Sequence, residues 1–474
     1  AVGYNSGRDV TTGINNTLVG AFAGTALTDA DYNVSLGYYA LSTDTLGSGS
    51  TAVGYQALVT QNFTTATTSY NTAVGYNAGL AVTTGVQNVL IGGLAGDALT
   101  DADDNTAIGV GALTTDTLGS KSTAIGRSTL QTQNFTTATD TFNTAVGFQA
   151  GIAVTTGIKN TIVGANAGDA ITTANKTTLF GYNTGTGITT GTDNTFMGAD
   201  VGVNVTTGKN NILVGGSVVG VAGGTGEALT TGHSNVAMGS GALKLEDTGR
   251  KSVAIGYLAL ATQNADVDNF NTAVGFEAGK AVTTGVDNTL IGALAGDALT
   301  DADYNVAIGI NALGSDTLGS RSVAVGRHAL ATQNFTTATN SYNTAVGYSA
   351  GIQVTTGQQN TLIGGDAGDA ITTADENTVI GYQSGTALTV GNNNVAVGSL
   401  SLGSDTKGDR NVAVGRAALF SQNFTTTTDS YNTAVGYGAG STISTGIQNT
   451  LMGGLAGDAL TDADYNVAIG ASAL

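Results

Sequence analysis

A short motif, in which an aliphatic residue, Met or Phe precedes a glycine, recurs along the whole chain and constrains its fold more than any other feature. The motif glycines run from Gly3 to Gly470. Twenty of the 26 intervals between them are 17 residues long, four are 21, one is 24 and one is 19. A fixed period of this kind is the signature of a solenoid, because one short coil cannot bury its own apolar side chains and stacked copies can. The sequence therefore predicts an all-β parallel β-solenoid of about 17 residues per coil and 27 coils.

The residues around each motif glycine predict the strand of each coil. The residue before the glycine is apolar in every copy, and the residue three before it is mostly Thr, Val or Ile. These two positions point to one side of an extended chain. The residue two before the glycine alternates between Ala and a larger apolar residue, which predicts a second apolar side and a strand buried on both faces. The rest of each repeat is rich in turn residues, so we expect two short strands and two turns per coil.

The position four before the motif glycine is nearly always Asn. A stacked Asn can hydrogen-bond the coils above and below it and tolerates a left-handed turn conformation. We therefore predict a structural ladder of asparagines at one corner of the coil. Its representative members are Asn16, Asn33, Asn71, Asn88, Asn105, Asn143, Asn160, Asn288, Asn305, Asn343, Asn360 and Asn466.

A longer repeat of 72 residues, three coils of 17 and one of 21, is superimposed on the short one. It separates Gly3 from Gly75, Gly75 from Gly147, and Gly275 from Gly347. We interpret residues 1–474 as one continuous repeat array with irregular coils around 215–275, and as a segment of a longer fibre.

The composition excludes several classes of protein. Of the 474 residues, 72 are Gly, and Pro, Cys and Trp are absent. The formal net charge is −19 with only 15 Lys and Arg, which argues against binding to nucleic acid. No apolar run is long enough to cross a bilayer, so we expect no membrane insertion in this segment.

The motifs "NTAVG", "NVAIG" and "KSVAIG" resemble the head repeats of trimeric autotransporter adhesins. Longer strings, such as "STAVGYQAL" at 50–58 and "NTAVGYNAG" at 71–79, are similar to repeats of bacteriophage tail fibres. The resemblance covers the whole chain, although the adhesin coil is typically shorter. It implies a left-handed β-roll and a homotrimer, intertwined or side by side, with the second, Ala-containing face of the strand at the trimer interface.

Two sets of side chains are candidate sites. Phe63, Phe135, Phe335 and Phe424 lie in the four-residue extensions of the long coils, where they could protrude as surface-binding tips. The alternative is that these rings fold back over a neighbouring coil or chain. The pairs Asp101 with Asp103 and Asp301 with Asp303 lie on turns and are weak candidates for Ca²⁺, with solvated turns as the alternative.

The expected function is therefore mechanical. We expect an extracellular fibrous protein, on a cell or virion surface, whose shaft or head displays loops for attachment to a host glycan or protein. The alternative is a self-assembling structural filament without a receptor. Catalytic residues, and a cofactor other than Ca²⁺, are not expected, because the carboxylates are scattered over turns.

Overall fold

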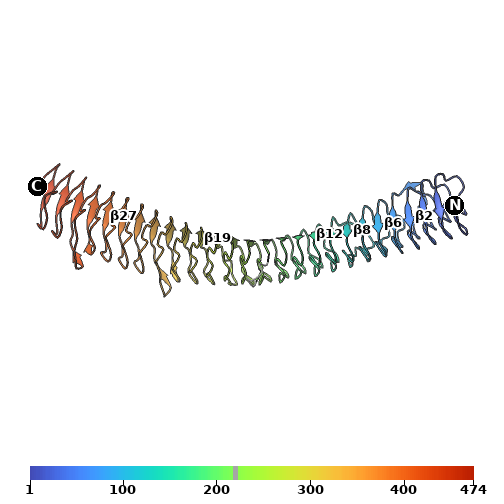
Figure 1. Cartoon of the computed structure of the whole chain (residues 1–474), viewed down its shortest axis with the longest axis horizontal. Coiled ribbons are helices and arrows are strands. Elements are labelled where there is room, and N and C mark those ends of the chain that lie inside the picture. Colours follow the sequence, from blue (N-terminus) through green and yellow to red (C-terminus); the bar gives the residue numbers. More distant parts are fainter. Residues whose placement is uncertain (217–222) are drawn as a thin grey trace. The chain divides into compact units, whose positions relative to one another are not determined.

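A computed structural model describes residues 1–216 and 223–474 of the chain. These residues form two compact units, Ala1–Asn235 and Val236–Leu474, and each unit is a parallel β-solenoid. The described residues contain no helix and carry 26 strands of three residues, which confirms the solenoid and its period. In Figure 1 the strands of successive coils lie side by side along each unit.

Each strand occupies the three residues before a motif glycine. The strands of the first unit are β1 (Thr17–Val19), β2 (Val34–Leu36), β4 (Thr51–Val53), β6 (Thr72–Val74), β7 (Val89–Ile91), β8 (Thr106–Ile108), β10 (Thr123–Ile125), β12 (Thr144–Val146), β13 (Thr161–Val163), β14 (Thr178–Phe180), β15 (Thr195–Met197) and β16 (Ile212–Val214). Those of the second unit are β17 (Val236–Met238), β18 (Val253–Ile255), β19 (Thr272–Val274), β20 (Thr289–Ile291), β21 (Val306–Ile308), β23 (Val323–Val325), β25 (Thr344–Val346), β26 (Thr361–Ile363), β27 (Thr378–Ile380), β28 (Val395–Val397), β30 (Val412–Val414), β32 (Thr433–Val435), β33 (Thr450–Met452) and β34 (Val467–Ile469).

Neighbouring strands pair in register, so that the same motif position lies above itself. In β6 and β7, for example, Thr72 pairs with Val89, Ala73 with Leu90, and Val74 with Ile91. A slip of one residue would exchange the two faces of the strand, and the strict 17-residue period prevents it. Before β1, a single parallel bridge joins Val2 to Val19.

The prediction of two strands in every coil is wrong for most coils. Among the described residues, a second strand, two residues long, occurs only in the 21-residue coils and the coils before them. These strands form the isolated parallel pairs β3 (Gly47–Ser48) with β5 (Thr67–Thr68), β9 (Gly119–Ser120) with β11 (Thr139–Asp140), β22 (Gly319–Ser320) with β24 (Thr339–Asn340), and β29 (Gly408–Asp409) with β31 (Thr428–Asp429). Elsewhere among the described residues the backbone between the three-residue strands forms turns and bends, and a single bridge joins Arg250 to Asp268 beside the 19-residue coil.

The core of each unit lies inside the coils, behind the middle residue of every strand. This residue, two before the motif glycine, is buried throughout the two units, as Ala73 and Leu90 illustrate. Its size is balanced by the residue four after the glycine, which is usually Leu where the strand has Ala and Gly where the strand has a larger residue. Ala107 is thus matched by Leu113, and Leu90 by Gly96, where an added Cβ would lie 2.7 Å from a Leu90 methyl group.

This arrangement corrects the assignment of the strand faces. We expected the Ala-containing face to meet other chains, whereas the structure turns it inward. The residues one and three before the motif glycine point outward instead. In most coils the alternation between Ala and larger residues keeps the packed volume similar. Where both positions are small, as in Ala73 with Gly79, leucines of the neighbouring coils, Leu58 and Leu90, lie against the glycine.

The motif glycine is required because neighbouring backbones approach closely there. Gly75 has a φ of 147°, and a Cβ added to it would lie 2.4 Å from the carbonyl oxygen of Gly92 on the next coil. No side chain fits at that distance, so only glycine allows strands of adjacent coils to turn together at this point.

The asparagine ladder is present and buried, but its bonds run mainly to the backbone. The Asn88 Oδ1 accepts a hydrogen bond from the backbone N–H of Asn105 at 3.0 Å, and its Nδ2 donates to the Ala102 carbonyl at 2.8 Å. The same pair of bonds recurs at Asn71, Asn143, Asn288 and Asn360, among others. Each ladder Asn therefore satisfies two polar backbone groups of the following coil that would otherwise be buried without partners.

The left-handed conformation belongs to the residue before the ladder Asn and not to the Asn itself. Gln87, Asp104 and Lys121 have φ values near 60°, as do residues of many other types at this position. The prediction that Asn was chosen for this conformation is therefore wrong, and its hydrogen bonds explain its selection.

Part of the irregular region around 215–275 lies outside the described residues. The 24-residue interval between Gly215 and Gly239 includes residues 217–222, which lie outside the described residues. Whether the array is continuous across this interval stays a prediction.

Candidate functional site

The outward side of the strands exposes apolar side chains along each unit. We call it the outer sheet face and define it by the residues one and three before each motif glycine; the residues five before and one after the glycine form its two edges. Ile91, Ile291 and Ile363 are 37%, 38% and 37% exposed, and Phe180 is 54% exposed. Parallel sheets are normally covered on both faces, so an uncovered row of β-branched and aromatic side chains is a feature of binding surfaces.

One edge of the outer sheet face carries exposed aromatic rings at the residue after the motif glycine. Tyr38, Tyr55 and Tyr76 stack along the first unit, with ring centroids 5.5 and 5.3 Å apart. In the second unit Tyr257 stacks on Phe276 at 5.4 Å. The rings lie nearly parallel to one another, so they present their edges outward, while their faces are covered by their neighbours.

Three arginines also occupy this edge, each one coil before an aromatic ring. Each arginine directly follows a motif glycine, and the aromatic residue directly follows the motif glycine of the next coil. The guanidinium groups of Arg127, Arg327 and Arg416 lie 6.0, 5.9 and 5.7 Å from the rings of Phe148, Tyr348 and Tyr437, respectively. Each such contact is a cation–π interaction, worth about 0.5–1 kcal/mol at an exposed site. At these three places the edge therefore combines an aromatic with a cationic group.

The opposite edge has a second set of cations and rings, five residues before the motif glycine. Lys121 lies 5.4 Å from the Phe142 ring and forms an ion pair of 2.6 Å with Asp140. The hydrogen bond to Asp140 raises the pKa of Lys121, so this side chain stays positive at neutral pH. Lys251 and Arg410 lie over Phe270 and Tyr431 in the same way.

The phenylalanines of the long coils do not protrude. Phe63, Phe135, Phe335 and Phe424 are 5–7% exposed, and their rings fold back over the coil. The interpretation in which these rings are surface-binding tips is therefore wrong for the rings, and the alternative describes them. The residues that follow Phe63 and are exposed are Thr64, Thr65 and Ala66.

A buried polar cluster holds each of these phenylalanines. Asp44 accepts hydrogen bonds from the backbone N–H groups of Gly47 and Phe63, both at 3.1 Å, and from the Gln61 Nε2 at 2.6 Å. Gln61 in turn accepts from the Nδ2 of the ladder residue Asn71. The same contacts recur around Asp116, Asp316 and Asp405. Burial raises the pKa of Asp44.

The candidate calcium ligands bond to their own chain. The Asp101 Oδ1 accepts from the Thr84 hydroxyl at 2.5 Å, and the Asp103 Oδ1 accepts from the Val86 N–H at 2.8 Å. Asp301 and Asp303 repeat these bonds with Thr284 and Val286. Among the described residues, no group of three or more His, Cys, Asp or Glu is placed to hold a metal ion. Binding of Ca²⁺ at these pairs stays a prediction.

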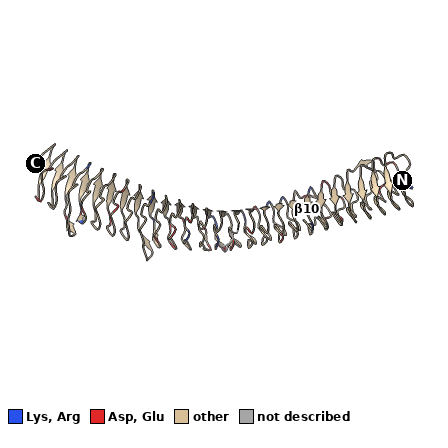
Figure 2. Cartoon of the chain, viewed as in Figure 1, with Lys and Arg blue, Asp and Glu red and all other residues tan. Residues whose placement is uncertain are grey.

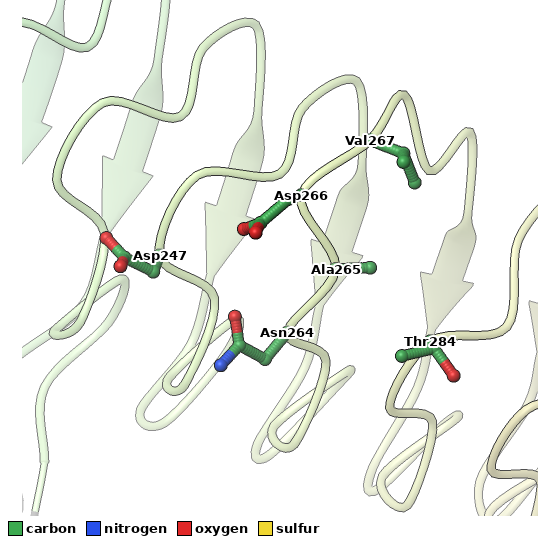
Figure 3. A pocket seen from close by; sticks show the side chains of 6 residues that line it. All are labelled: Asp247, Asn264, Ala265, Asp266, Val267 and Thr284. Atoms are coloured by element: carbon green, nitrogen blue, oxygen red, sulfur yellow. The ribbon is translucent and has the colours of Figure 1, made fainter.

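The second unit has a depression of about 510 Å³ beside its 19-residue coil. Asp247, Asn264, Ala265 and Asp266 line it with Val267 and Thr284. In Figure 3 the side chains of Asp266 and Asn264 point toward the coil that carries Asp247. Ala265 stands where the long coils have Phe, and Glu246 stands where they have the buried Asp. Glu246 keeps the contacts of the buried Asp, because it accepts from the Gln263 Nε2 at 2.8 Å and from the Gly249 N–H at 2.7 Å, and it also accepts from the Asn269 Nδ2 at 3.0 Å.

Lys, Arg, Asp and Glu residues are few and scattered along the coils, as the colours of Figure 2 show. No model of a known protein family matches the chain, and no curated protein matches it. Across the part of the chain that the structure describes, we find no helix long and apolar enough to span a membrane. The fold and the surface therefore carry the argument about function.

Sequence reasoning missed the aromatic edges of the outer sheet face. Their signal was present, because Tyr or Phe follows many motif glycines, as in "VGY" and "VGF". It was overlooked because the faces of the strand were assigned in reverse order.

Proposed function

We propose that this chain is part of an extracellular fibre, in which three copies pack through their outer sheet faces to form a left-handed β-roll trimer. The fibre spans distance and displays the exposed loops of its long coils for attachment to a host or other surface. The observation that carries the proposal is the unbroken apolar row one residue before every motif glycine, which packing within a single coil does not require.

The physical argument for self-association rests on area and composition. Val, Ile, Leu, Met and Phe fill this row, and an obligate interface resembles a protein core divided in two. Burial of apolar surface stabilises by roughly 25 cal/mol per Å². A repeating surface meets its best match in another copy of the same repeat, since the spacing of the coils is then identical on both sides.

A charge placed on the outer sheet face tests the assembly. Ile291→Glu and Ile363→Glu, combined in the full chain, are expected to lower the mass in solution to that of one chain. Leu245→Glu is a matched control, because Leu245 is 45% exposed but lies on a turn away from the strands. If the double variant still had the mass of a trimer, the outer sheet face would not be the interface.

The second candidate is a structural filament that needs no receptor. The in-register stacking of coils favours it, because the same hydrogen bonds that join coils could join chains end to end. Electron microscopy of the purified chain without any partner separates the two functions. Long polymers favour the filament, whereas discrete short rods that bind cells or glycans favour attachment.

The attachment function has its own test. Replacement of the exposed loop residues Thr64–Ala66 and their equivalents by Gly-Ser segments is expected to abolish binding to cells or glycans while the mass in solution stays unchanged. Replacement of the exposed turn residues Thr156 and Thr173 by Ser is the control. Unchanged binding of the loop variant would contradict attachment through these loops.

A further inference from the structure

A pocket of about 320 Å³ lies at Gly49, on one edge of the outer sheet face of the first unit. It is lined by Asp31, Tyr32, Ser48, Gly49, Thr68 and Tyr70. Tyr32, Gly49 and Tyr70 occupy the same position, five before the motif glycine, in three successive coils. Both tyrosines are 63% exposed, and glycine leaves the space between them without a side chain.

The second unit contains the same three positions with the space filled. There Tyr304, Arg321 and Tyr342 replace Tyr32, Gly49 and Tyr70. The Arg321 guanidinium lies 4.8 Å from the centroid of the Tyr304 ring and 6.0 Å from that of Tyr342. The two rings are only 48% and 52% exposed, because the guanidinium between them covers part of each.

The backbone has the same conformation and hydrogen bonding at Gly49 and at Arg321. The backbone N–H of Gly49 donates a hydrogen bond to the backbone carbonyl of Asp31 at 2.9 Å, and the backbone N–H of Arg321 donates to the backbone carbonyl of Asp303 at 3.0 Å. Both residues are left-handed, with φ values of 73° and 64°. A Cβ added to Gly49 would approach no closer than 3.4 Å to any side chain, so the pocket is large enough for a side chain that it does not have.

Every equivalent position in the other long-coil repeats is also a cation. Lys121, Lys251 and Arg410 each lie over an aromatic ring, at 5.4, 4.8 and 5.6 Å. Gly49 is therefore the position where this chain omits its own cation but keeps two tyrosines and the carboxylate of Asp31. Two ring faces and an acid, in a chain of net charge −19, make a recognition site for organic cations.

We infer that the Gly49 pocket binds a guanidinium or alkylammonium group from outside the chain, between Tyr32 and Tyr70 and near Asp31. The group takes the position that Arg321 takes in the second unit. A bare metal ion is a poor match, because rings and a single carboxylate do not replace its shell of oxygen ligands.

Titration of the full chain, labelled with fluorotyrosine and followed by ¹⁹F NMR, tests this inference. The probes are N-acetyl-arginine amide, an arginine-containing peptide and tetramethylammonium, each compared with NaCl at equal ionic strength. Saturable shifts are expected for the Tyr32 and Tyr70 resonances, with those of Tyr304 and Tyr342 unchanged. Tighter binding of the peptide than of the amide would identify a polypeptide as the source of the cation.

Two matched variants keep the test decisive. Gly49→Arg fills the pocket from within and is expected to abolish the saturable shifts, without disturbing the backbone. Arg321→Gly opens the second place and is expected to raise the stoichiometry from one cation per chain to two. Tyr70→Ala should weaken binding about threefold to fivefold, in line with the loss of one exposed cation–π contact. The inference is overturned if organic cations shift the resonances no more than NaCl, or if Gly49→Arg binds as well as the unaltered chain.

Discussion

At the scale of single residues, paired sizes inside the coil decide which side chains the core accepts. Ala107 and Leu113 are both fully buried, and in the next coil toward the N-terminus the same positions are Leu90 and Gly96. The large side chain thus moves between two positions while the filled volume stays similar, as expected in a close-packed interior.

Exchanging the small and large side chains at positions 107 and 113 tests this pairing. Ala107→Leu alone overpacks the coil and is expected to cost about 1–3 kcal/mol, and Leu113→Gly alone leaves a cavity at about 2–5 kcal/mol. The double variant is expected to cost less than the sum, because the new leucine fills the new cavity. Amide hydrogen exchange of β8 (Thr106–Ile108) measures these local free energies. Strict additivity would contradict the size pairing.

The asparagine ladder gives a second prediction at this scale. Asn88→Ala leaves the Asn105 N–H and the Ala102 carbonyl buried without partners, and we expect a loss of about 1–3 kcal/mol. Asn88→Ser is expected to cost less, since serine stands at the same position in residues 50, 122, 252 and 322. Thermal unfolding monitored by circular dichroism compares the two. Equal losses would show that the hydrogen bonds of the amide are not what the position requires.

At the scale of elements, the long coils are separate units of stability within the array. Each adds four residues and compensates with a buried Asp, a Gln and a phenylalanine in place of the apolar residues that other coils have there. This exchange was not predictable from single columns of the repeat, because the sequence showed the Phe but not the carboxylate beneath it.

Removing the buried phenylalanine ring from a long coil tests its contribution to stability. Phe135→Ala is expected to cost about 3–5 kcal/mol and to open the loop 134–140 locally, because the ring is buried over the coil. Limited proteolysis should then cleave within that loop. Phe148→Ala is the control, since Phe148 is 44% exposed and we expect little effect. Resistance of the Phe135 variant to the protease would contradict the role of the ring.

The sequence predicted the repeat, the parallel pairing, the register and the ladder, because each depends on neighbours at a fixed separation along the chain. The side to which each strand face turns was predicted in reverse. Alternation along three residues distinguishes two faces without telling which is inside, and only the matching of Leu113 to Ala107 across the coil settles it.

At the scale of the whole molecule, the balance of charge predicts how stability depends on pH. Burial is the largest cause that raises the pKa of Asp44 and Glu246, and also of the partly buried Asp97 and Asp297. A carboxyl with a raised pKa binds its proton more tightly in the folded state than in the unfolded chain. Stability therefore increases as pH falls from neutrality through the folded pKa toward the unfolded value.

The melting temperature is thus expected to rise as the pH falls from neutrality toward the pKa of an unfolded carboxyl group, about 4, helped by the smaller net negative charge. Differential scanning calorimetry at constant ionic strength measures this change. A melting temperature that falls steadily over the same range would show that the exposed ion pairs outweigh the buried carboxyls.

The central claim is that the outer sheet face is covered by other copies of the chain. Light scattering coupled to size-exclusion chromatography tests it most directly. The account predicts a particle of about three times the chain mass of 46.7 kDa, which Ile291→Glu with Ile363→Glu reduces to one chain. A stable, monodisperse particle of 46.7 kDa for the unaltered chain would contradict it.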